Sequence, residues 1–240
     1  MWITKILIRM LHPKFEEFLS DRALRINQAR LEHLESLNLD LSEKKVLEVG
    51  AGIGLLSEFF EKRNCDILST DSRQENITEL KRGYPQRKVA LLDLEKDLDP
   101  KMWGKFEVVF CYGTLYHLSV PEKAIRNLAK ISSGIILVET IVEPQNKYSI
   151  GVVPEKDSVS QSSSRKGSRP TRLAVFKLLK KYFGFAYSTT TQPNHPDFIT
   201  DWKLPPKQTF YRAVFIGSKK PLKASTLLAH LPQKQKTYVS

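Results

Sequence analysis

Residues 46–54 read VLEVGAGIG, an apolar run that ends in three glycines at alternate positions. Glycine adopts backbone conformations that other residues avoid, so a strand ending in such a run lets the main chain approach a ligand closely. The dinucleotide fingerprint G-x-G-x-x-G needs a glycine or alanine at position 55, which is Leu55 here. No phosphate loop ending in Gly-Lys-Ser/Thr occurs in the chain. The turn therefore predicts a nucleoside-containing ligand and disfavours a nicotinamide dinucleotide, which stays as an alternative.

On both sides of this turn, apolar runs alternate with segments of helical periodicity. The predicted strands are 44–50, 65–71, 88–94, 106–113 and 134–141, and the predicted helices between them are 54–64, 72–85 and 121–131. Near-continuous apolar strands separated by helices predict an α/β fold with a parallel sheet covered on both faces. Farther along, a helix beginning at Pro170 and strands within 187–192 and 209–220 are expected.

The remaining segments define the expected domain organisation. Residues 142–169 have little periodicity and a Ser-rich centre, so we predict a long loop that acts as a lid or substrate loop. We expect an N-terminal helical cap over residues 1–43, one α/β domain over residues 44–240, and a tail from residue 222 to the end.

Carboxylates follow the glycine turn at regular places. Glu48 precedes Gly50 and Gly52, Asp71 ends the second predicted strand, and Asp93 ends the third. As a set, these residues resemble the motifs of the class I S-adenosylmethionine-dependent methyltransferases, over about residues 44–141. The resemblance implies a Rossmann-like doubly wound sheet of seven strands, mostly parallel with an antiparallel last strand. It also implies S-adenosyl-L-methionine as the cofactor and methyl transfer as the activity.

The same resemblance implies roles for individual residues. Asp71 would accept hydrogen bonds from the ribose hydroxyls, Asp93 would lie near the adenine amino group, and Glu48 would lie near the amino-acid end of the donor. The implied cofactor-binding residues are Glu48, Gly50, Ala51, Gly52, Asp71, Ser72, Asp93, Leu94, Cys111 and Tyr112. Structural roles stay open for three of them: Asp71 as a helix cap, Glu48 as a buried carboxylate, and Cys111 as a small strand residue.

Candidate catalytic residues follow the fourth predicted strand in the segment FCYGTLYHL, residues 110–118. The sulfonium is a good leaving group, so the enzyme chiefly supplies alignment and, for a hydroxyl acceptor, a base. An imidazole titrates near neutral pH, which makes His117 the candidate base, and Tyr116 is a second candidate catalytic residue. Either side chain has a structural alternative, as a histidine bonded to a nearby carbonyl or as a packed aromatic ring.

Net charge distinguishes the two parts of the chain. The total is +12, with 17 basic and 4 acidic residues in 144–240 against 21 basic and 22 acidic residues in 1–143. The excess predicts an anionic ligand at the C-terminal part, or else a solvated lysine-rich surface. The motifs SRPTR and TQPNHPDF resemble those of a bacterial methyltransferase-domain subgroup of uncertain substrate, and they supply the candidate substrate-binding residues Arg169, Asn194 and His195.

Two acceptor classes remain open. Segments LYHL and LVET are also similar to those of the enzyme that carboxymethylates wobble uridine in tRNA, and bases interleave with aromatics in KKYFGFAY and TFYRAVF, as RNA binding would need. Because those aromatics have helix or strand spacing, we expect most of them in the core and favour a small-molecule or glycan hydroxyl over RNA. A non-catalytic nucleoside- or RNA-binding protein is the alternative of another class.

The termini and cysteines indicate the compartment. The start, MWITKILIRMLHPKF, is predicted to be an amphipathic helix rather than a secretory signal, because a clean apolar centre and a cleavage site are missing. No run of about 18 apolar residues suggests a membrane span. Cys65 and Cys111 make no disulfide framework, which favours the reducing cytoplasm. The scattered His and Cys residues predict no metal site.

Overall fold

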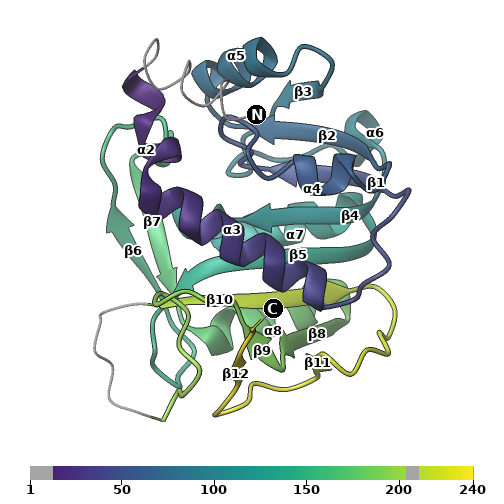
Figure 1. The fold of residues 1–240 in the computed structure, drawn as a ribbon, viewed down its shortest axis with the longest axis vertical. Helices are drawn as coiled ribbons and strands as arrows, with labels where there is room; N and C mark the ends of the chain where they lie inside the picture. Colours follow the sequence, from purple (N-terminus) through teal and green to yellow (C-terminus); the bar gives the residue numbers. More distant parts are fainter. Residues whose placement is uncertain (1–12, 204–210, 240) are drawn as a thin grey trace.

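The computed structural model describes residues 13–203 and 211–239, and an eight-stranded sheet runs through them in the order β11-β8-β10-β5-β4-β1-β2-β3 (Figure 1). The strands are β1 (Lys45–Val49), β2 (Asp66–Asp71), β3 (Lys88–Leu91), β4 (Phe106–Tyr112), β5 (Ser132–Val142), β8 (Phe185–Thr189), β10 (Tyr211–Ser218) and β11 (Leu227–Leu228). Neighbours from β3 through β5 are parallel, whereas β10 runs antiparallel to both β5 and β8. The ligand-binding edge of such a sheet lies at the carboxyl ends of the parallel strands.

The predicted doubly wound sheet with an antiparallel late strand is confirmed, with one strand more than the seven expected. The additional strand, β11, pairs antiparallel with β8. Two further short strands, β9 (Thr191–Gln192) and β12 (Lys236–Thr237), pair with each other in parallel. The segment predicted to be a tail is therefore paired along this side of the molecule. Two-residue strands have no periodicity, so the sequence pattern did not reveal them.

Helices cover both faces of the sheet. They are α2 (Glu16–Leu19), α3 (Asp21–Ser36), α4 (Glu58–Glu61), α5 (Gln74–Gly83), α6 (Pro100–Trp103), α7 (Pro121–Ile131) and α8 (Arg172–Phe183), with 3₁₀ turns η1 (Pro13–Phe15) and η2 (Leu115–His117). One apolar cluster joins α3 and α4 to the sheet, and another joins α7 and α8 to the opposite face. This arrangement follows from side chains that alternate between the two faces of each strand. In Figure 1, α3 lies across the front of the sheet.

Two predicted helices differ in detail. The segment 54–64 forms only the four-residue α4, and α8 begins at Arg172 rather than at Pro170. The Thr171 side chain accepts a hydrogen bond from the amide of Ala174, so Thr171 caps α8. The amphipathic helix predicted at the start falls mostly on residues 1–12, which lie outside the described residues, as do residues 209–210 of the last predicted strand.

A β-hairpin occupies the region predicted to be a structureless loop. Strand β6 (Ile150–Pro154) pairs antiparallel with β7 (Lys166–Pro170) through five residue pairs. The hairpin stands where β5 ends, at the carboxyl edge of the sheet (Figure 1). Its glycines, prolines and polar residues conceal the period-2 pattern that identifies a strand. Residues 155–165, which connect the two strands, are called the lid below.

Candidate active site

Two adjoining cavities lie at the carboxyl edge of the parallel strands. The smaller has a volume of about 90 Å³ and the larger of about 390 Å³. Gly50, Gly113 and His117 line both cavities, so the two spaces meet at the ends of β1 and β4. Ala51, Tyr112, Tyr116 and Arg169 line the larger cavity, and Gly52, Asp71, Ser72 and Asp93 line the smaller one.

The glycine turn brings the main chain against its neighbours more closely than a side chain would permit. Gly50 has a φ of +65°, and a Cβ atom there would lie 2.2 Å from Oγ1 of Thr114. Gly52 has a φ of +56°, and its Cβ would lie 2.7 Å from the ring of Phe18. Both the left-handed backbone and the crowding require glycine at these two positions. The turn thus leaves backbone as the wall of the smaller cavity.

Asp71 ties the end of β2 to the glycine turn. Its Oδ2 accepts a hydrogen bond from the amide of Gly52 at 2.9 Å, and its Oδ1 accepts from the amide of Arg73 at 2.9 Å and from Nδ2 of Asn76 at 3.1 Å. Burial raises the pKa of this carboxyl, against the opposing effect of those donors. Asn76 also has a buried Oδ1 without a partner among the described residues. A buried acceptor left unsatisfied beside a cavity indicates a place for a ligand donor.

Three of the expected cofactor residues lie away from both cavities. Glu48 is buried and accepts hydrogen bonds from the hydroxyls of Ser57 and Ser69, and burial raises its pKa. Leu94 and Cys111 pack in the apolar cluster under α7 and α8. Burial raises the pKa of the Cys111 thiol to about 12. All three side chains are buried in the protein interior and reach neither cavity.

The lid lies against the smaller cavity and contacts Arg73, which precedes α5, and Glu17 of α2. The Arg73 guanidinium donates to the carbonyls of Gln161 and Ser162, at 3.1 and 3.0 Å, and pairs with Asp157 at 3.2 Å. On the other side, the hydroxyl of Ser158 donates to Glu17 at 2.8 Å. Residues 160–163 of the lid line the smaller cavity. These contacts join residues that are far apart in the chain, so no local sequence pattern predicts them.

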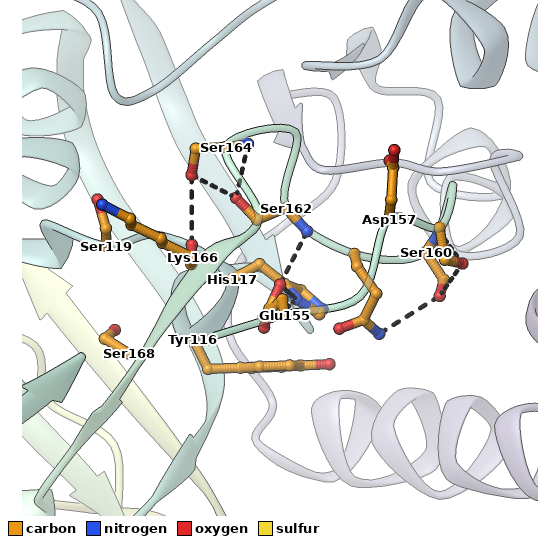
Figure 2. Close-up of polar contacts among 12 residues, drawn as sticks. Tyr116, His117, Ser119, Glu155, Asp157, Ser160, Ser162, Ser164, Lys166 and Ser168 are labelled. Carbon is orange, nitrogen blue, oxygen red and sulfur yellow. Dashed lines mark hydrogen bonds and ion pairs between the residues drawn. The ribbon is translucent and has the colours of Figure 1, made fainter. Parts of the chain in front are cut away.

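At the base of the lid, Glu155 holds His117. Nδ1 of His117 lies 2.9 and 2.8 Å from the two carboxylate oxygens of Glu155. Figure 2 shows Glu155 between His117 and Ser162, whose amide donates to Glu155 at 2.8 Å. Burial lowers the pKa of His117, but the charges of Tyr116 and Glu155 outweigh burial and raise it. The carboxylate fixes the proton on Nδ1, which leaves Nε2 as the acceptor.

Tyr116 stacks on His117 in an electropositive setting. The two ring centroids are 4.0 Å apart, and Nη2 of Arg212 donates to the phenol oxygen at 3.4 Å. Burial raises the pKa of Tyr116, but the positive charges of His117, Arg212 and Arg30 outweigh burial and lower it to about 8. The phenol therefore ionises more readily than an ordinary tyrosine.

A buried carboxylate, Glu139 of β5, organises the arginines behind this ring. It is fully buried, forms a salt bridge with Nη2 of Arg30, and accepts from Nη1 of Arg212 at 3.1 Å. Sequence reasoning missed these three residues, although an acid within the apolar strand GIILVETI is a signal that a buried partner is required.

The segment TQPNHPDF contributes a different residue from those expected. Asn194 and His195 line neither cavity, whereas Asp197 pairs with Arg22 at 2.7 Å and with Nε of Arg212 at 3.5 Å. Arg22 and Arg212 both line the larger cavity, so this segment acts on the cavity wall through Asp197.

Across residues 13–203 and 211–239, no group of three or more His, Cys, Asp or Glu side chains is arranged to hold a metal ion. Within the same ranges, no helix is both long and apolar enough to cross a membrane.

Comparison with known proteins relates this site to a family. A family model described as a methyltransferase domain matches residues 18–181. The ubiquinone biosynthesis O-methyltransferase of Acinetobacter baylyi is 27% identical over 135 residues, which cover 53% of this chain and 56% of that protein. The corresponding protein of Coxiella burnetii is 30% identical over 108 residues, covering 44% and 46%. The chain thus spans about half the length of these curated relatives.

Solved structures share the fold. The N-terminal domain of EvdMO1, crystallised in the presence of S-adenosylhomocysteine (SAH) and D-fucose, has a TM-score of 0.63 at 21% identity, with 84% of this chain and 85% of that chain covered. The magnesium protoporphyrin IX methyltransferase ChlM of Synechocystis, with bound SAH, has a TM-score of 0.55 at 13% identity, covering 91% and 99%. These likenesses confirm the Rossmann-like architecture predicted from the alternating strands and helices.

Proposed function

The chain belongs to the methyltransferase domain family, and we propose that it transfers a methyl group from S-adenosyl-L-methionine to a hydroxyl group of a small-molecule acceptor. The observation that carries this proposal is the position of His117. Its ring lines both cavities, and its Nδ1 is held by Glu155. A base at the junction of a donor cavity and an acceptor cavity is what transfer to a hydroxyl requires.

The residues of the smaller cavity fit the nucleoside end of this cofactor. Asp71 and Asp93 offer carboxylate oxygens to a diol and an amine, and the unpartnered Oδ1 of Asn76 offers a further acceptor. The shared wall at Gly50 lets the ligand continue into the larger cavity past Ala51 and Tyr112. When bound, S-adenosylmethionine supplies an electrophilic methyl group on a sulfonium that leaves readily.

The chain's own residues then align the acceptor and take its proton. His117 accepts the hydroxyl proton on Nε2, and Glu155 stabilises the imidazolium that results. The raised pKa of His117 makes its neutral form a stronger base than an ordinary histidine. Tyr116, stacked on this ring, is a second candidate for contact with the acceptor.

The size of the acceptor space and the buried aromatics support a small molecule over RNA. The larger cavity holds about 390 Å³. In the segments that interleave bases with aromatics, Phe183, Tyr187, Tyr211 and Phe215 are buried, whereas Phe185 is exposed. Buried rings are not available to stack on nucleobases. The O-methyltransferase names of the curated relatives support oxygen as the methyl acceptor.

Calorimetry with SAH tests the cofactor assignment. Gly52→Trp places an indole where even a Cβ meets Phe18, so saturable binding is expected in the natural chain and is expected to be lost in this variant. Gly83→Trp is the matched control, because a Cβ at Gly83 has nothing within 4 Å. Absence of binding to the natural chain at high micromolar concentration would refute the assignment.

Transfer itself is tested with methyl-labelled donor and cell extract separated into RNA, glycan and small-molecule pools. Label in the small-molecule pool is expected, and label confined to RNA would contradict the proposal. With the labelled fraction as substrate, His117→Ala is expected to lower turnover by about 10²- to 10⁴-fold. Glu155→Gln is expected to move the acid limb of the pH–rate profile to lower pH, because it removes a charge that raises the pKa of His117. Full turnover by His117→Ala would remove this residue as the base.

A further inference from the structure

The larger cavity is lined by four arginines that converge from three separate elements. Arg22 and Arg30 come from α3, Arg169 from β7 and Arg212 from β10. Only Arg22 is widely exposed, with 64% of its side chain accessible, whereas Arg30 and Arg212 retain 9% and 10%. Arginines held this deeply beside a cavity are costly unless charge or ligand compensates them.

The carboxylates that compensate three of these arginines, Arg22, Arg30 and Arg212, lie behind the wall. Glu139 holds Arg30 and Arg212, and Asp197 holds Arg22 and Arg212, yet neither carboxylate lines the cavity. The guanidinium groups therefore present their charge to the cavity from fixed positions. Glu17 is the one acidic side chain in its wall among the described residues, and it is engaged by the lid serines.

Two buried polar atoms in the same wall have no partner within the described part of the chain. They are the phenol oxygen of Tyr112 and Nε of Arg30, in residues that are 4% and 7% exposed as a whole. Both residues line the larger cavity. Buried polar atoms are nearly always satisfied, so these two indicate that a polar group of the donor or of the acceptor lies against them.

We propose that the acceptor carries a carboxylate or phosphate group, which the arginines of the larger cavity bind while its hydroxyl lies against His117. This inference rests on the proposed function and names the substrate class of that site. Arg169 and Arg212 lie with their guanidinium carbons 5.8 and 5.2 Å from the ring centroid of Tyr116. Guanidinium groups bind carboxylate and phosphate through two parallel hydrogen bonds, which fix the orientation of the acceptor.

The test compares charged and neutral acceptor analogues by calorimetry on the protein saturated with SAH. One pair is 3,4-dihydroxybenzoate and catechol, which differ by a carboxylate, and the other is glucose 6-phosphate and glucose, which differ by a phosphate. At least one charged probe is expected to bind about tenfold or more tightly than its neutral partner. The pair that shows the difference identifies the anionic group.

Variants assign the preference to the cavity. Arg169→Gln is expected to remove most of the preference. Arg22→Gln, which changes an exposed side chain, is expected to remove part of it. Arg25→Gln is the matched control on the same helix, because Arg25 is exposed and lies outside the cavity wall. Affinity for SAH is expected to stay within about twofold in all three variants, which also reports that each is folded.

The outcomes are distinguishable. Equal binding of charged and neutral probes, with SAH bound normally, overturns the inference and leaves the proposed function standing. Parallel loss of SAH binding in Arg169→Gln also overturns the inference, because the arginine then serves the carboxylate of the donor. Failure of the natural chain to bind SAH overturns the proposed function and the inference together.

Discussion

Replacement of Glu139 by alanine leaves two buried guanidinium groups without their shared counter-charge. Glu139 is fully buried, and the side chains of Arg30 and Arg212 retain only 9% and 10% exposure. Arg212 keeps Asp197 at 3.5 Å, whereas Arg30 keeps a neutral partner, Oδ1 of Asn27 at 2.8 Å. The cost therefore falls chiefly on Arg30.

Breaking a buried ion pair by removing one partner costs about 3–5 kcal/mol of unfolding free energy. For a chain of this size, 1 kcal/mol corresponds to about 2–4 °C in Tm, so Glu139→Ala is expected to lower Tm by about 6–20 °C. The double variant Arg30→Ala with Glu139→Ala is expected to lose less than the sum of the two single changes, because no unpaired guanidinium remains at position 30.

Thermal and urea unfolding followed by circular dichroism measure these differences. Glu79→Ala is the matched control: Glu79 is 4% exposed, but its partner Arg82 retains 43% side-chain exposure and stays solvated when the acid is removed. A loss of about 1 kcal/mol or less is expected there. If Glu139→Ala were no more destabilising than this control, the ion-pair cluster would not be a major source of stability.

Three further changes test other parts of the structure. Gly50→Ala introduces a Cβ 2.2 Å from Thr114 at a φ of +65°, so a loss of about 2–4 kcal/mol in chemical unfolding is expected, against less than about 1 kcal/mol for Gly83→Ala; similar losses would contradict the crowding argument. Burial lowers the pKa of His33 to about 4. As the pH falls, His33 is therefore protonated near pH 6.5 in the unfolded chain but only near pH 4 in the folded chain. Stability is expected to fall by about 2–3 kcal/mol between pH 7 and pH 4.5, and urea titrations of His33→Gln should lack that part of the slope. Arg73→Ala removes three contacts to the lid and is expected to speed trypsin cleavage within the lid several-fold; an unchanged rate would mean that Arg73 does not hold it.

Local patterns were sufficient for the central sheet. The apolar runs that became β1, β4 and β5 are largely buried on both faces, so their hydrophobicity identified them as parallel strands. The family resemblance assigned Asp71 and the glycine turn to the same ligand, and in the structure the amide of Gly52 donates to Asp71. The direction in which a side chain turns was harder to predict: Glu48 bonds to Ser57 and Ser69 behind the turn.

Local sequence patterns did not predict the hairpin that carries the lid. Residues 150–170 have the composition of a loop, yet five residue pairs make a hairpin of them at the edge of the sheet. The sequence did not predict Glu155 as a site residue, because an isolated glutamate is usually solvated. Its contact with His117 depends on the hairpin bringing it back over the site, across 38 positions of chain.

By itself, the sequence determined the doubly wound sheet and the edge at which a nucleoside-containing ligand would bind, because hydrophobic periodicity and glycine turns act over a few residues. Only the tertiary structure decided how the larger cavity is built. Its arginines come from α3, β7 and β10, and the carboxylates that fix them come from β5 and the segment after β9. Charges so far apart in the chain interact strongly only when folding removes the water between them.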